Sequence, residues 1–172
     1  MACGAATGIG SARAHAQLLG GPAGPMRVYI SNDDHTDFVW NCSEATNRAS
    51  FVSMFDYYLD QKDATIGNTP DWQSRFNADS SYWVKVYREE RTPAQFNRLI
   101  DGIRSGHIGV PLTTLVSTYG GTPAEGVLRG LYYGGSLERE FNIRLPIAMA
   151  MENQVMPWGL SSLWAGSGAK YS

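Results

Sequence analysis

The chain has 172 residues, of which 43% are hydrophobic and 17% charged, and its formal net charge is -2. This length suits one domain with a sizeable core, and the small, mixed charge excludes a typical nucleic-acid or membrane-surface protein. Two cysteines are too few for a disulfide framework or a cysteine-rich zinc site, and no apolar run approaches the roughly 18 residues of a membrane span.

The first 25 residues differ from the rest, since they are rich in Ala and Gly and contain no acidic residue. Their GAATGIG run is similar to the glycine turn of short-chain dehydrogenases, but that turn needs a preceding strand, and only three residues precede it here. The segment has no clear signal peptide, so the location of the protein is unknown and cytoplasmic by default. We predict a flexible leader over 1–25 and a separate catalytic region over 26–172.

From residue 26 onward, apolar patterns of strand and helix type alternate along the chain. In chain order, the patterns predict a strand at 27–31, a helix at 44–61, a turn at NTPDWQ, a strand at 74–78, a helix from Pro93 to Gly106, a strand at 107–112, a helix at 123–141, a strand at 143–149 and a helix at 159–166. Such alternation indicates an α/β fold whose parallel sheet is either open or closed into a barrel. Four βα units are about half of a barrel, so we expect the N-terminal part of a larger catalytic domain.

The clearest chemical signal follows the first predicted strand, in NDDHTDFVW. His35 and Asp37 are two residues apart, so both side chains point to the same side if the strand geometry persists, and together they suit a divalent metal such as zinc. The alternative is a loop in which His35 is solvated and the preceding aspartates cap the next helix. Trp40 is a candidate floor for a bound sugar, or else a buried core residue.

Five segments in the same order resemble the N-terminal catalytic domain of family 38 glycoside hydrolases, the retaining α-mannosidases. HTDFVW resembles the family's HxDxxW motif, and FNADSSYWVKVYREE, LIDGIRSGHIGV, AEGVLRGLYYGGSLEREFNI and SSLWAGSGAKY resemble successive later segments. The similarity covers roughly residues 27–172. It implies part of a seven-stranded β/α barrel of the glycoside hydrolase and deacetylase type.

The resemblance implies that His35 and Asp37 bind zinc, and that the metal grips adjacent hydroxyls of a terminal mannose whose ring lies beside Trp40. The aspartate expected as the nucleophile is not found, because counting back from Glu125 gives Thr118 and no acid lies between Ile108 and Ala124. Two acids just after predicted strands, Asp79 and Glu152, are the catalytic candidates, with loop or capping residues as the alternative; Asn153 is a candidate for hydrogen bonds to sugar hydroxyls.

The predicted function is therefore metal-dependent hydrolysis of terminal α-mannose or a related sugar in a mannose-containing glycan. A non-catalytic carbohydrate-binding relic and a metal-dependent carbohydrate deacetylase remain as alternatives. We expect no nucleic acid and no membrane as partners, and we expect the C-terminal remainder of the same chain to complete the barrel. A half-barrel alone would leave sheet edges and an apolar face uncovered and would self-associate.

Three charged groups receive structural interpretations. Glu125 and Arg129 are spaced i, i+4 on a predicted helix, which favours an ion pair. His107 begins a strand at the end opposite the expected site, so it is predicted to be structural. The run 88–91 is predicted to be a solvated face.

Overall fold

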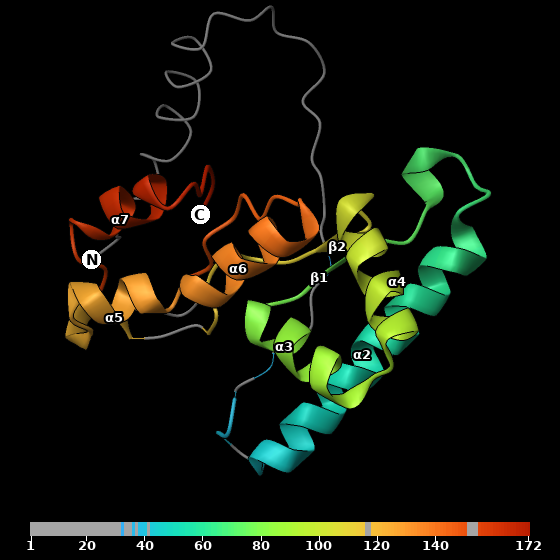
Figure 1. The fold of residues 1–172 in the computed structure, drawn as a ribbon, viewed down its shortest axis with the longest axis horizontal. Coiled ribbons are helices and arrows are strands. Elements are labelled where there is room, and N and C mark those ends of the chain that lie inside the picture. Colours follow the sequence, from blue (N-terminus) through green and yellow to red (C-terminus); the bar gives the residue numbers. More distant parts are fainter. Residues whose placement is uncertain (1–31, 33–35, 37, 41, 116–117, 151–154) are drawn as a thin grey trace, which may run out of the picture. The chain divides into compact units, whose positions relative to one another are not determined.

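A computed structural model of the chain describes residues 32, 36, 38–40, 42–115, 118–150 and 155–172. The predicted leader at 1–25 and the predicted strand at 27–31 lie outside these residues. The described elements, in chain order, are α2 (Glu44–Thr65), the 3-10 turn η1 (Pro70–Trp72), β1 (Phe76–Asn77), α3 (Ser81–Glu90), α4 (Pro93–Arg104), β2 (Ile108–Gly109), the 3-10 turn η2 (Tyr119–Gly121), α5 (Ala124–Arg129), α6 (Tyr132–Phe141) and α7 (Leu160–Gly166) (Figure 1). Helices and parallel strands alternate, so the α/β class is confirmed.

Strand segments that are neighbours in space are also neighbours in the chain. β1 and β2 pair in parallel, with Phe76 opposite Ile108. Beyond β2, the Leu112 N–H donates to the carbonyl of Ile147 at 2.7 Å, and Ile147 forms a parallel bridge with Tyr171. The predicted strands at 74–78 and 107–112 are thus confirmed in shorter form, as β1 and β2. The strand predicted at 143–149 is not formed, since Ile147 makes only an isolated bridge there.

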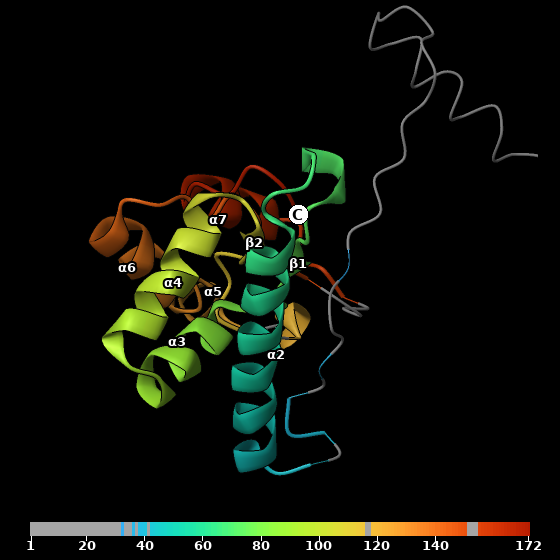
Figure 2. The same ribbon diagram turned by 90° about the vertical axis from the view of Figure 1, so that its right-hand side faces the viewer.

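Helix α2 begins at its cap Ser43, whose hydroxyl accepts a hydrogen bond from the Thr46 N–H at 3.2 Å. The helix packs against α3 and α4 (Figure 2). Its apolar face buries two phenylalanines, Phe51 and Phe55, against Trp83 of α3, with ring centroids 4.6 and 6.2 Å apart. These aromatic contacts are the centre of the core, and they hold the helices over one side of the sheet.

Helix α4 has the ends that its sequence predicts. Thr92 accepts from the Gln95 N–H while the Gln95 side chain accepts from the Thr92 N–H, which together form a capping box, and Pro93 is the first helical residue. Gly106 follows the last turn with φ +75°, a left-handed conformation that favours glycine. All the donors and acceptors at the start of α4 are close in sequence, so the sequence alone was sufficient to predict where this helix begins and ends.

Two helix predictions need correction. The sequence patterns gave no helix at 81–90, where the structure has α3; its buried residues are largely aromatic or β-branched, so burial rather than helix propensity stabilises it. The single helix predicted at 123–141 is two helices, α5 and α6. The chain breaks at Gly130, whose carbonyl accepts a hydrogen bond from the Thr114 N–H at 2.7 Å.

Residues 88–90 of the charged run are exposed, as predicted, whereas Arg91 is half-buried. Side chains of the run also join neighbouring helices. Arg88 pairs with Glu140 of α6 at 2.6 Å, and Arg91 pairs with Asp56 of α2 at 2.6 Å. The hydroxyl of Tyr87 donates to the same Asp56 carboxylate at 2.7 Å. The Arg91 and Tyr87 hydrogen bonds hold the pKa of Asp56 below its ordinary value despite the opposing effect of burial.

His107 is a structural residue, as predicted. Its Nδ1 lies 2.9 Å from Ser105 Oγ and its Nε2 lies 2.9 Å from Gln73 Oε1, and the ring is buried beside β2. Burial, together with the positive charges of Arg75 and Lys62, lowers the pKa of His107 below its ordinary value. The neutral ring is therefore the form that the fold favours.

We expect the stability of the chain to decrease with acidity partly through His107. Because its folded pKa is below the unfolded value of about 6.5, its contribution is present above that pH and is lost as pH falls through the folded pKa. His107→Gln should show a shallower loss of stability between about pH 7 and pH 5. Urea midpoints measured at several pH values check this, and equal pH dependence in both proteins would contradict it.

Among the described residues, no helix is both long and apolar enough to cross a lipid bilayer.

Candidate functional site

The carboxyl ends of the strand segments meet beside a small hollow. Its volume is about 230 Å³, and its walls are mostly apolar. The lining residues are Asn77, Ala78, Gly109, Val110, Pro111, Ile147 and Met149. In α/β proteins the carboxyl end of a parallel sheet is where ligands bind, so this hollow locates the candidate site.

Asp79 lies two residues beyond β1, directly beside this end of the sheet, and only 4% of it is exposed. Its Oδ2 accepts a hydrogen bond from the backbone N–H of Thr36 at 3.3 Å. In the sequence Thr36 stands between His35 and Asp37, which themselves lie outside the described residues. A predicted catalytic acid thus contacts the residue between the two predicted metal ligands.

A second contact joins the same two segments. The backbone N–H and the side-chain Nδ2 of Asn77 both donate to the carbonyl of Asn32, at 3.2 and 3.1 Å. The side chain of Asn77 lies over its strand partner Gly109, where an added Cβ would be 2.2 Å from Asn77 Oδ1. Neither residue was predicted from the sequence to belong to the site, although glycine within a strand is a known sign of close backbone or side-chain approach.

Trp40 is 83% exposed, so its interpretation as a core residue is wrong, and its contact with a sugar stays a prediction. The preceding Val39 has φ 61°, a conformation that is costly for a β-branched residue. The buried Asn47 of α2 holds this turn, because its Oδ1 accepts from the Val39 N–H at 2.8 Å. Phe38 anchors the other side by packing edge-on against Tyr82, with centroids 5.4 Å apart.

Glu152 and Asn153 are outside the described residues. The strand segment before them is fixed at Met149, whose N–H donates to Thr113 Oγ1 at 3.1 Å and whose carbonyl accepts from the Tyr119 hydroxyl at 3.3 Å. Thr118 is exposed and caps η2. Away from the strand ends, Glu125 and Arg129 form the predicted ion pair at 2.8 Å.

Within the described ranges, no group of three or more His, Cys, Asp or Glu side chains is close enough to hold a metal ion. The donors predicted for zinc, His35 and Asp37, are outside those ranges. Zinc binding is therefore still a prediction.

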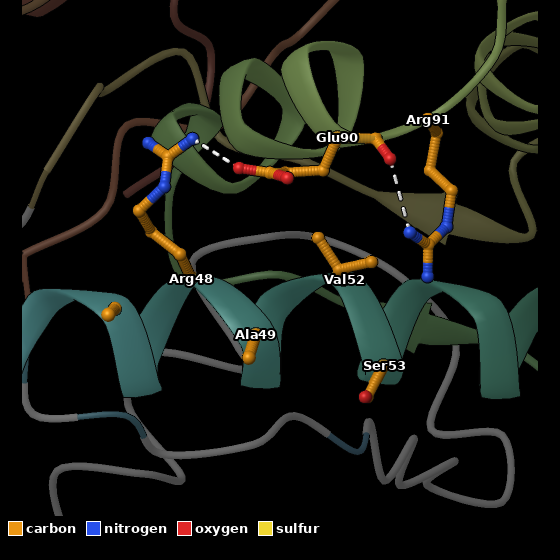
Figure 3. Close-up of a pocket in the computed structure, with 7 residues that line it drawn as sticks. Arg48, Ala49, Val52, Ser53, Glu90 and Arg91 are labelled. Carbon is orange, nitrogen blue, oxygen red and sulfur yellow. Dashed lines mark hydrogen bonds and ion pairs between the residues drawn. The ribbon is translucent and has the colours of Figure 1, made fainter.

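A larger hollow, of about 440 Å³, lies between α2 and the end of α3 (Figure 3). Ala49 and Val52 form part of its floor, and Arg48 spans it to reach Glu90 at 2.8 Å. Arg91 on its far side donates to the backbone carbonyl of Glu90 at 3.2 Å. Both arginines are committed to ion pairs, and the hollow lies on the helices and away from the strand ends, so it is a poor match to the predicted chemistry.

Comparison with solved structures gives a fold likeness. A crystal structure of a protein in the glycosyl hydrolase family 38 from Enterococcus faecalis superposes with a TM-score of 0.60 over 81% of this chain. The two sequences are 14% identical over the match, and this chain spans 15% of the length of that protein. No protein-family profile and no curated protein sequence matches the chain. The fold is like that of part of a glycoside hydrolase.

Proposed function

We propose that residues 26–172 are the N-terminal portion of a family-38-like catalytic domain that hydrolyses terminal α-mannose, or a related sugar, in a carbohydrate substrate. The observation that supports this most is the contact of Asp79 with Thr36 at the carboxyl end of the strands, in a fold that resembles part of a glycosyl hydrolase family 38 protein. A buried acid is thus held against the segment that carries the HxD motif.

We further propose that the strands belong to an incomplete β/α barrel. Their spatial order follows the chain order, from Asn32 through β1 and β2 to Ile147 and Tyr171. A doubly wound sheet reverses its strand order at a switch point, whereas a barrel adds each strand next to the last. In this proposal, further βα units of the same polypeptide complete the barrel.

The donor set fits zinc by its chemistry, since an imidazole and a carboxylate are both common zinc ligands. When bound, zinc would supply a Lewis acid for sugar hydroxyls. Asp79 keeps the Thr36 backbone in place beside this donor pair through its hydrogen bond. The exposed indole of Trp40 offers an apolar face against which a pyranose ring can stack.

The two acids proposed for the chemistry are Asp79 and Glu152, without a fixed division of roles. A retaining glycosidase needs a nucleophile and a proton donor about 5 Å apart, and the proton donor must reach the leaving oxygen. In the sequence Asp79 follows β1 and Glu152 comes three residues after Met149, and β1 and Met149 both border the hollow. Asn153 would donate its amide hydrogens to sugar hydroxyls.

The test is a double substitution, His35→Ala with Asp37→Ala, in the full chain. We expect bound zinc, measured by elemental analysis, to fall from about one equivalent to a trace, and any cleavage of an aryl α-mannoside to be lost. Asp71→Ala, at an exposed position in η1, is the matched control and should change neither. Unchanged zinc content and unchanged activity in the double variant would contradict the proposal.

A second candidate, a carbohydrate-binding protein without turnover, is favoured by the lack of any acid between Ile108 and Ala124. It predicts retained affinity for mannosides in calorimetry and no product under any supplied metal. Release of acetate from an acetylated glycan would instead indicate a deacetylase.

A further inference from the structure

Two contacts tie the segment 32–36 to the strand-end region, and they come from alternate residues of the chain. Asn77 holds the carbonyl of Asn32 through its backbone and its side chain, and Asp79 holds the N–H of Thr36. Asn77 ends β1 and Asp79 lies two residues beyond it, so the two contacts hold Asn32 and Thr36 at the same strand end.

The hydrogen bond from the Asn77 side chain to Asn32 depends on the residue opposite Asn77 in β2. Asn77 pairs with Gly109, and paired residues of parallel strands present their side chains to the same face. A Cβ on Gly109 would lie 2.2 Å from Asn77 Oδ1 and 3.2 Å from its Cγ, and real Cβ atoms do not approach so closely. The amide can therefore reach Asn32 in its observed position only because residue 109 is a glycine.

We propose that Asn77 is a positioning residue, whose amide, lying over Gly109, fixes Asn32 against β1 so that Thr36 is held at Asp79. Although both residues line the hollow at the strand ends, the role proposed here is exerted through Asn32 and Thr36. Only the expected effect on zinc binding rests on the proposed function, because the contacts of Asn77 and Asp79 lie within the described residues.

The geometry makes two predictions about the backbone of the segment. Asn77→Ala removes the side-chain donor and leaves the backbone hydrogen bond, and Gly109→Ala displaces the amide without changing Asn77. In each variant we expect hydrogen exchange at the Thr36 amide to become about tenfold faster. Without the Asn77 side-chain hydrogen bond to Asn32, the hydrogen bond from Thr36 to Asp79 should break more often. Adding Gly109→Ala to Asn77→Ala should have little further effect, since no amide is left to displace.

Zinc binding by the same variants, measured in the full chain, tests whether Asn77 positions the predicted metal ligands. Groups that orient metal ligands typically change metal affinity by about 10- to 100-fold when they are removed. We expect at least about tenfold weaker zinc binding in competition with a chromophoric chelator, and a changed visible spectrum when cobalt(II) is bound in place of zinc. A purely structural role would lower the melting temperature without moving the cobalt spectrum.

Asn68→Ala is the matched control. Asn68 also donates its side-chain amide to a backbone carbonyl, that of Trp72 at 3.2 Å, but in the exposed turn after α2. It should leave Thr36 exchange and zinc affinity unchanged.

Unchanged Thr36 exchange in both Asn77→Ala and Gly109→Ala would overturn the inference, whatever the zinc result. If Thr36 exchange responds but the parent chain binds no zinc, the proposed function fails and the positioning role stands. If the parent binds zinc and both variants bind it equally well, with an unchanged cobalt spectrum, positioning of the metal-binding segment is wrong. If Asn77→Ala is unfolded under the conditions of measurement, Gly109→Ala tests the same contact.

Discussion

Trp83→Ala should destabilise the chain strongly. The indole is only 2% exposed, stacks on Phe51 with centroids 4.6 Å apart, and contacts Phe55 and Phe76 at centroid distances of 6.2 Å. Removing such a side chain from a packed core costs about 3–5 kcal/mol, because apolar burial is lost and a cavity remains. Natural domains are stable by only about 5–15 kcal/mol, so this loss is a large fraction of the total and should lower the denaturation midpoint clearly.

Chemical denaturation followed by far-UV circular dichroism measures this effect. Trp158→Ala is the control, since Trp158 is fully exposed and its removal should change the free energy of unfolding by less than about 0.5 kcal/mol. Equal effects of the two substitutions would show that the aromatic cluster is not the centre of the core.

Two adjacent glycines in α6 should respond to alanine with opposite signs. A Cβ on Gly134 would lie 2.4 Å from the backbone oxygen of Leu112, so α6 would have to move off the strand segment. We expect Gly134→Ala to cost about 1–3 kcal/mol, the usual cost of overpacking. A Cβ on Gly135 would meet only the flexible end of Arg139, at 3.3 Å, so Gly135→Ala should stabilise by up to about 1 kcal/mol through helix propensity.

Each variant is the control for the other, because both make the same chemical change one residue apart. Thermal melts of the two proteins and the parent are sufficient. A stabilised Gly134→Ala would mean that α6 does not approach the Leu112 backbone as closely as described.

How well the sequence predicted each element depended on how local its determinants are. Helix α4 carries its own signals in Thr92, Pro93 and Gly106, and it was predicted correctly from end to end. Helix α3 carries no such signals, since its stability comes from Trp83 and Tyr87 packing on residues of α2 that are distant in the chain. The break at Gly130 similarly depends on a hydrogen bond from Thr114.

The same distinction applies to the candidate site. Its location at the strand ends and the candidacy of Asp79 could be predicted, because parallel topology alone places such residues at one edge. The roles of Asn77 and Gly109 could not, because they depend on the register that sets one opposite the other. The exposure of Trp40 was not predictable either, since composition suits a core or a surface tryptophan equally.

The order of the strand segments has a consequence for how the polypeptide acquires this structure. Since each segment pairs with the one synthesised just before it, every pairing encloses only the helices between two successive segments, from residue 76 to 108, from 112 to 147 and from 147 to 171. A nascent chain leaving the ribosome can therefore add its units one at a time, without waiting for a distant segment to be made.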